Sequence, residues 1–129
     1  MEVLSSRTII VTSDLDRARS FYEDILGLRV YREYGSGGAV TGVVLFLGGG
    51  FLELTTGTTA PVGDGIKLWV QVPDLAQEAA RLSLCPVKVN KPMARMPWGL
   101  IELWIEDPDG LEIRLIEVPS DHPLRGRLS

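Results

Sequence analysis

The stretch Thr8-Ile9-Ile10-Val11-Thr12-Ser13-Asp14-Leu15 decides the fold, because it recurs in altered form as Leu68-Trp69-Val70-Gln71-Val72-Pro73-Asp74-Leu75. In both copies a run of β-branched and apolar residues, typical of a strand, leads into an Asp-Leu pair. Asp14 and Asp74 lie 60 residues apart in a chain of 129 residues. This recurrence predicts an internal repeat that accounts for nearly the whole chain.

A helix is predicted to begin at each Asp-Leu pair. After the first pair, apolar residues fall on one stripe at spacings of three and four, which is typical of a helix face; they are Leu15, Ala18, Phe21, Tyr22, Ile25 and Leu26. Ser13 or Asp14 can cap the N-terminus of this helix, and Gly27 lies where a left-handed residue commonly ends one. The stripe of the second helix is weaker, and Pro86 prevents a long continuation.

Each half then returns to strand character three times. We expect strands at 28–33, 43–47 and 51–55 in the first half, and at 87–90, 100–105 and 112–117 in the second. Tight-turn sequences, Gly48-Gly49-Gly50 and Asp107-Pro108-Asp109-Gly110, join the last two strands of each half. Each half is therefore predicted to be β-α-β-β-β.

The predicted fold class is α+β, with two modules in a single domain. We place the first module at about 5–60, the second at about 65–118 and a C-terminal tail at 119–129, with Gly63-Asp64-Gly65 as the linker. One four-stranded sheet with one helix cannot cover both of its faces, so we expect neither module to be a separate domain.

The bulk properties exclude several classes of protein. A net charge of −4 and the absence of a basic run argue against nucleic-acid and anionic-membrane binding. No apolar run approaches the roughly 20 residues of a membrane span, and Met1-Glu2-Val3 does not begin a signal peptide. We therefore expect a cytoplasmic protein.

The motifs resemble those of the vicinal oxygen chelate superfamily, which contains glyoxalases, bleomycin resistance proteins and extradiol dioxygenases. The opening signature is the first strand and Asp-Leu pair followed by Ser20-Phe21-Tyr22 and Leu26-Gly27-Leu28, and the closing signature is Asp107-Pro108-Asp109-Gly110 before a strand. The resemblance covers roughly 7–117. It implies two βαβββ modules whose mixed sheets curl into a cup around a ligand, and a homodimer that completes the cup.

The resemblance also implies four metal-ligand positions, which are usually His or Glu. In this chain they hold Arg7, Glu53, Lys67 and Arg114. Charged Arg and Lys offer no lone pair, and the lone Cys and lone His of the chain, the latter in the C-terminal tail, cannot build a site. We therefore expect no metal and no other cofactor.

Two interpretations of these four positions remain open. In the first, Glu53 pairs with Arg7 or Arg114 and the pair plugs a cup that no longer has a function. In the second, three cations around one carboxylate leave a positive charge that favours a wet pocket for an anion, because buried ion pairs are costly to desolvate. We favour the second interpretation, in which the pocket is functional.

Aromatic residues of the second half suggest a wall for that pocket. Side chains alternate along a strand, so Trp69 shares a face with Lys67, and Trp104 shares one with Glu102. Trp98 follows a loop predicted at 91–97 that borders the cavity in relatives. A mobile loop is also predicted around Tyr31, Tyr34 and the glycine-rich residues 35–38.

The sequence thus predicts a metal-independent protein that holds a small organic ligand, anionic or aromatic, in an aromatic-walled cup, as drug-sequestering bleomycin resistance proteins do. The alternative is an enzyme of the lyase or isomerase type that uses Glu53 or Glu102 as acid/base. The predicted ligand-binding residues are Arg7, Glu53, Lys67, Trp69, Trp98, Glu102, Trp104 and Arg114.

Overall fold

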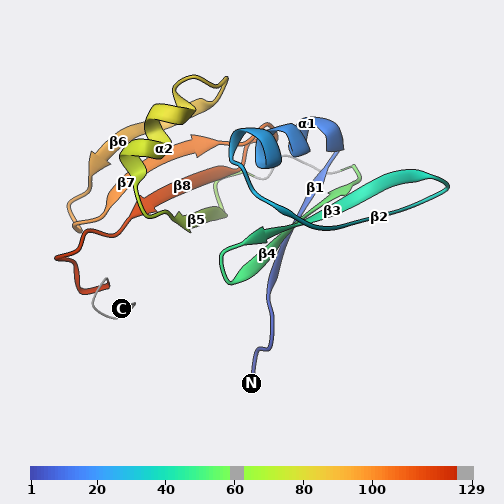
Figure 1. The fold of residues 1–129 in the computed structure, drawn as a ribbon, viewed down its shortest axis with the longest axis horizontal. Helices are drawn as coiled ribbons and strands as arrows, with labels where there is room; N and C mark the ends of the chain where they lie inside the picture. The colour runs from blue at the N-terminus through green and yellow to red at the C-terminus, as the bar shows by residue number, and fades with distance from the viewer. Residues whose placement is uncertain (59–62, 125–129) are drawn as a thin grey trace. The chain divides into compact units, whose positions relative to one another are not determined.

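The structure is a computed structural model that describes residues 1–58 and 63–124 (Figure 1). The contacts between residues divide the chain into two compact units, unit 1 at Met1–Pro61 and unit 2 at Val62–Ser129. Each unit contains one four-stranded mixed sheet with a helical segment. The predicted α+β class, with two βαβββ modules, is confirmed.

Unit 1 contains a sheet in the strand order β1-β4-β3-β2, in which β1 is parallel to β4 and the other pairs are antiparallel. Its elements are β1 (Arg7–Thr12), α1 (Leu15–Arg19), the π-helical segment η1 (Ser20–Ile25), β2 (Val30–Ser36), β3 (Ala39–Leu47) and β4 (Gly50–Thr56).

Unit 2 repeats this topology in the order β5-β8-β7-β6, with β5 parallel to β8. Its elements are β5 (Lys67–Gln71), α2 (Leu75–Leu82), β6 (Lys88–Arg95), β7 (Ile101–Glu106) and β8 (Glu112–Glu117).

The helix starts follow the predicted capping. Asp14 Oδ1 accepts a hydrogen bond from the Arg17 N–H at 3.0 Å, and Asp74 Oδ1 accepts one from the Gln77 N–H at 3.1 Å. Both bonds satisfy backbone donors that the first turn of a helix leaves free. Gly27, with φ of 78°, ends the first helical segment as expected.

The first helical segment is not a regular α-helix throughout. After Arg19 it widens into the π-helical segment η1, and the Leu26 N–H bonds to the Phe21 carbonyl at 2.9 Å. A π-turn inserts one extra residue. Phe21 and Tyr22 lie in this segment, and both are buried with ring centroids 5.0 Å apart, edge to face.

Two predicted loops are strands in the structure. Strand β6 continues to Arg95, so most of the loop predicted at 91–97 belongs to an edge strand, with its register shift around Pro92. Strand β2 continues through Gly35 and Ser36, and the turn to β3 consists of Gly37 and Gly38 with φ of 63° and 79°. Such a two-residue turn needs positive φ at both positions. The loop around Tyr31 and Tyr34 was therefore a wrong prediction.

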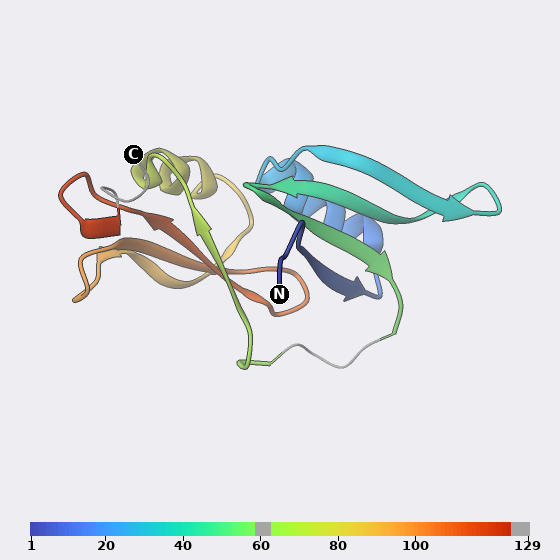
Figure 2. The ribbon, with the colours of Figure 1, turned by 90° about the horizontal axis from the view of Figure 1, so that it is seen from below.

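In each unit the helix packs on one face of the sheet (Figure 1 and Figure 2). The buried apolar side chains of that face include Leu52 and Leu54 in unit 1 and Ile105 and Ile113 in unit 2. We call the opposite face of each sheet its open face. Among the described residues, no helix has the length and hydropathy needed to cross a membrane.

Candidate functional site

Strand register fixes which side chains are neighbours on the open face of unit 1. Directly paired residues of adjacent strands point to the same side and form rows across the sheet. We name each row after one member. The Arg7 row holds Arg7, Phe51 and Phe46; the Glu53 row holds Ile9, Glu53, Val44 and Arg32; the Tyr34 row holds Val11, Thr55, Gly42 and Tyr34.

The carboxylate of Glu53 is held from two sides. Its Oε1 accepts a hydrogen bond from Arg7 Nη1 at 2.7 Å, and its Oε2 accepts one from the Tyr34 hydroxyl at 2.6 Å. The Tyr34 hydrogen bond, and after it the Arg7 guanidinium, lower the pKa of Glu53. Burial and the same hydrogen bond raise the pKa of Tyr34. Near neutral pH, Glu53 is therefore an ionised and weakly basic carboxylate.

Gly42 makes the Tyr34 contact possible. The Tyr34 ring lies directly over Gly42, where a Cβ atom would stand 2.1 Å from Tyr34 Cζ. On the outer side of this ring, the Arg32 guanidinium carbon lies 5.8 Å from the ring centroid. Gly42 was not recognised in the sequence, because the need for glycine there arises from the cross-strand partner.

An aromatic cluster extends the Arg7 row. The ring centroids of Tyr31, Phe46 and Phe51 lie 5.1 to 5.7 Å apart, and Tyr31 and Phe46 are 52% and 45% exposed. The Arg7 guanidinium carbon lies 5.8 Å from the centroid of Phe51. This cluster was not predicted from the sequence, although Phe46 and Phe51 flank the predicted Gly48-Gly49-Gly50 turn and pair directly across it.

The open face of unit 2 carries the same three rows with different residues. The Lys67 row holds Lys67, Glu112, Glu106 and Lys88; the Arg114 row holds Trp69, Arg114, Trp104 and Lys91; the Glu102 row holds Gln71, Ile116, Glu102 and Ala94. Lys67 and Trp69 were predicted to share a face, as were Trp104 and Glu102, and the strand register agrees with both predictions.

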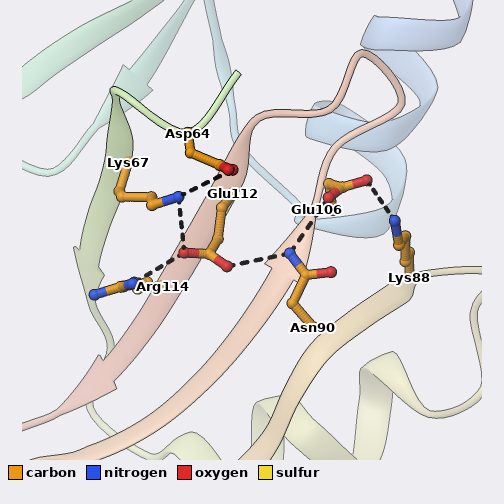
Figure 3. Close-up of polar contacts among 7 residues, drawn as sticks. All are labelled: Asp64, Lys67, Lys88, Asn90, Glu106, Glu112 and Arg114. Atoms are coloured by element: carbon orange, nitrogen blue, oxygen red, sulfur yellow. Dashed lines mark hydrogen bonds and ion pairs between the residues drawn. The ribbon is translucent and has the colours of Figure 1, made fainter. Parts of the chain in front are cut away.

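Glu112 is the acid partner of both cations at the former ligand positions of unit 2 (Figure 3). Its carboxylate accepts hydrogen bonds from Arg114 Nε at 3.0 Å and Asn90 Nδ2 at 3.2 Å, and lies 3.6 Å from Lys67 Nζ. Burial alone would raise the pKa of Glu112, but these partners outweigh it and the pKa is lowered. Lys67 and Arg114 thus have an acid of their own, which the sequence analysis did not assign to them.

Figure 3 also shows that this network continues along the same sheet. Asn90 Nδ2 donates to Glu106 at 3.3 Å as well as to Glu112, and Lys88 Nζ lies 3.1 Å from Glu106. Across the Lys67 row the two adjacent acids, Glu112 and Glu106, are bridged by Asn90 and flanked by Lys67 and Lys88, so the row is close to neutral.

Glu102 orients two of the three tryptophans. Its Oε2 accepts a hydrogen bond from Trp98 Nε1 at 2.6 Å and its Oε1 accepts one from Trp104 Nε1 at 2.7 Å. Glu102 is only 3% exposed, so neither oxygen faces bulk water. The Arg114 guanidinium carbon lies 3.7 Å from the Trp104 ring centroid, and Lys91 Nζ lies 5.7 Å from it.

Trp69 and Trp98 are half exposed, at 50% and 53%. Trp98 lies in the turn before β7, where its carbonyl oxygen is 3.1 Å from His122 Nε2. His122 does follow the last strand, as predicted, and its Nδ1 accepts a hydrogen bond from the Leu124 N–H at 3.2 Å. The C-terminal segment therefore holds the turn that carries Trp98.

The four positions that correspond to family metal ligands do not fit a divalent metal. Glu53 is bound to Arg7, and Lys67 and Arg114 are bound to Glu112, so the cations occupy the carboxylate oxygens that a metal would need. Within residues 1–58 and 63–124, no three His, Cys, Asp or Glu side chains gather as a metal site would require.

Comparisons with known proteins agree with the fold. TioX from Micromonospora sp. ML1 is 20% identical over 89% of this chain and 98% of its own, with a TM-score of 0.74. A superfamily member from Sphaerobacter thermophilus DSM 20745 is 24% identical over 90% and 98%, with 0.68. Lactoylglutathione lyase from Agrobacterium tumefaciens is 21% identical over 91% and 94%, with 0.66.

These likenesses establish the fold, and the sequence itself establishes the family. No curated protein matches the chain significantly. The sequence model of one family, however, matches residues 5–115, which is most of the chain. The chain therefore belongs to the Glyoxalase/Bleomycin resistance protein/Dioxygenase superfamily.

Proposed function

We propose that this protein binds a small aromatic organic molecule noncovalently, against an open sheet face and without a metal. The observation that carries this proposal is the half-exposed aromatic cluster of Tyr31, Phe46 and Phe51 beside a carboxylate, Glu53, that is already bound by Arg7 and Tyr34. Exposed clusters of large apolar side chains are costly in water and are typical of ligand or interaction sites.

Metal independence is supported by the chemistry of the four former ligand positions. Three of them hold Arg or Lys, and the fourth, Glu53, already accepts hydrogen bonds from Arg7 and Tyr34. A metal would have to displace both Arg7 and Tyr34 from Glu53. The other three positions would still hold cationic side chains, which cannot coordinate a metal. Binding to aromatic side chains needs no such rearrangement.

Noncovalent binding is favoured over the acid/base alternative by the state of the two glutamates. A general base works best with a pKa near the operating pH, whereas the pKa of Glu53 is lowered. The buried carboxylate of Glu102 accepts from two indoles. Both residues are better suited to hold other side chains in place than to exchange protons with a substrate.

The test is calorimetric titration of protein dialysed against a chelator, with naphthalene-2-carboxamide as a neutral aromatic probe. We expect saturable binding and recovery of the probe chemically unchanged. Phe46→Ala should weaken binding about tenfold, because a ring pair contributes roughly 0.5–1.5 kcal/mol beyond the area buried. The control Leu84→Ala removes another exposed apolar side chain, outside the open face, and should have no effect.

Binding that required added Zn²⁺ or Mg²⁺ would contradict metal independence, and a chemically altered probe would favour the enzyme. The resemblance also leads us to propose a homodimer in the cytoplasm. Light scattering at micromolar concentration checks the dimer, and a monomer there would contradict it.

A further inference from the structure

We propose that the ligand of unit 1 is an aromatic anion, with its ring on Tyr31, Phe46 and Phe51 and its acidic group bound by Arg7. This inference rests on the proposed function and names the chemical class of its ligand. It is carried by the charges and the backbone geometry around the aromatic cluster.

A β-bulge creates the cluster. The register of β2 against β3 shifts between Val30 and Arg32, so Tyr31 is the extra residue. In a regular strand Tyr31 and Arg32 would point to opposite faces, and bulges commonly re-aim side chains in this way. Here the Tyr31 ring contacts Phe46 and Phe51, and Arg32 covers Tyr34, so both reach the open face.

The open face of unit 1 has an excess of positive charge. Among its paired positions the charged residues are Arg7, Arg32 and Glu53. Arg7 forms an ion pair with Glu53, and Arg32, which lies over the Tyr34 ring, acts on the same carboxylate through its charge. Two cations therefore share one acid. A negatively charged ligand would balance that excess, which supports an anion over a neutral or cationic aromatic molecule.

Arg7 is placed to bind the acidic group directly. Only its Nη1 is used by Glu53 in the described structure, and its side chain is 39% exposed. Its guanidinium lies beside Phe51, at one end of the aromatic cluster. A planar guanidinium has five N–H donors, so it can bind Glu53 and a ligand carboxylate together.

The experiment compares 2-naphthoate with its neutral isostere naphthalene-2-carboxamide by calorimetry at low salt. We expect 2-naphthoate to bind at least tenfold more tightly to the unaltered protein, since a hydrogen bond to a charged group contributes roughly that factor. Arg7→Lys keeps the charge beside Glu53 but loses the forked donors, and should remove most of the difference. Arg32→Gln should reduce it about two- to fivefold, as for an exposed charge.

Arg95→Gln is the matched control, because it removes an exposed arginine of unit 2 and should leave the ratio of the two affinities unchanged. Equal affinity for the two probes would overturn the inference while leaving the proposed function standing. A preference for naphthoate that survives both Arg7→Lys and Arg32→Gln would also overturn it. If neither probe bound, the proposed function itself would fail.

Discussion

Replacing Gly42 by alanine should disturb the hydrogen bonding of the Glu53 carboxylate through Tyr34, although Glu53 itself is unchanged. A Cβ atom at this position would lie 2.1 Å from Tyr34 Cζ and 2.3 Å from Tyr34 Oη. These distances are far inside van der Waals contact, so the ring must move. The hydroxyl that donates to Glu53 at 2.6 Å would move with it.

The expected energies can be worked from these contacts. Loss of a hydrogen bond to a charged group costs about 1.5–3 kcal/mol, and alanine in a strand recovers about 0.5–1 kcal/mol over glycine. Gly42→Ala should therefore destabilise the protein by about 1–2 kcal/mol. In a Tyr34→Ala background the ring and its hydrogen bond are already gone, so the same substitution should stabilise by about 0.5 kcal/mol.

Urea unfolding of the four proteins of this double-mutant cycle measures the reversal of sign. Gly49→Ala is the control, because a Cβ atom there meets nothing within 4 Å and its φ is not positive; its effect should be the same in both backgrounds. If Gly42→Ala destabilised both backgrounds equally, Gly42 would not support the Tyr34 contact, and the reasoning would be refuted.

Three further predictions concern the carboxylates and metal binding. The lowered pKa values of Glu53 and Glu112 mean that their ionised forms stabilise the fold above the ordinary glutamate pKa, and that this stability is lost as the pH falls through the lowered values. Unfolding midpoints should fall over that acidic range, and Glu53→Gln should reduce the fall; an identical pH profile would contradict this. Glu102→Gln retains only one acceptor oxygen for the indole N–H groups of Trp98 and Trp104. One of the two indole N–H signals should therefore move, in NMR spectra, to the position of a solvated indole. If neither signal moved, Glu102 would not hold either tryptophan. Adding Zn²⁺ to chelator-treated protein should leave Tm unchanged, since a metal bound only by the native state would raise it with concentration.

The sequence was sufficient to predict the repeated framework but not the partners on the open faces. Asp14 and Asp74 begin helices because capping is a local interaction, and local interactions can be read from sequence. The pairing of Lys67 with Glu112 depends instead on the parallel register of β5 against β8. A register shift of one residue would turn every side chain to the other face, so such a pairing cannot be fixed from sequence spacing alone.

Tyr31 shows a second reason why the contacts on the open faces were not predicted from the sequence. It lay within the strand predicted at 28–33 and beside the predicted glycine-rich loop, but the bulge that brings it to the open face of β2 was not predicted. A bulge leaves no reliable sequence signal when its extra residue is not glycine. The aromatic cluster was therefore not predicted, although Tyr31, Phe46 and Phe51 all lay within predicted strands.

Comparison of equivalent rows indicates where the two units have diverged. The Arg7 row of unit 1 is largely aromatic and the equivalent Lys67 row of unit 2 is wholly charged, while Glu53 is replaced at its equivalent position by Arg114. The helix-facing sides keep apolar residues in both units, because close packing tolerates little change in volume. The open faces are free of that constraint, and it is there that the two units differ. In unit 2 Lys67 and Arg114 are paired with Glu112, whereas in unit 1 Arg7 and Arg32 share the single carboxylate of Glu53. Arg7 also lies beside the aromatic cluster of Tyr31, Phe46 and Phe51, and this is why we assign the anionic ligand to unit 1 and not to Lys67 and Arg114, the two cationic former ligand positions of unit 2.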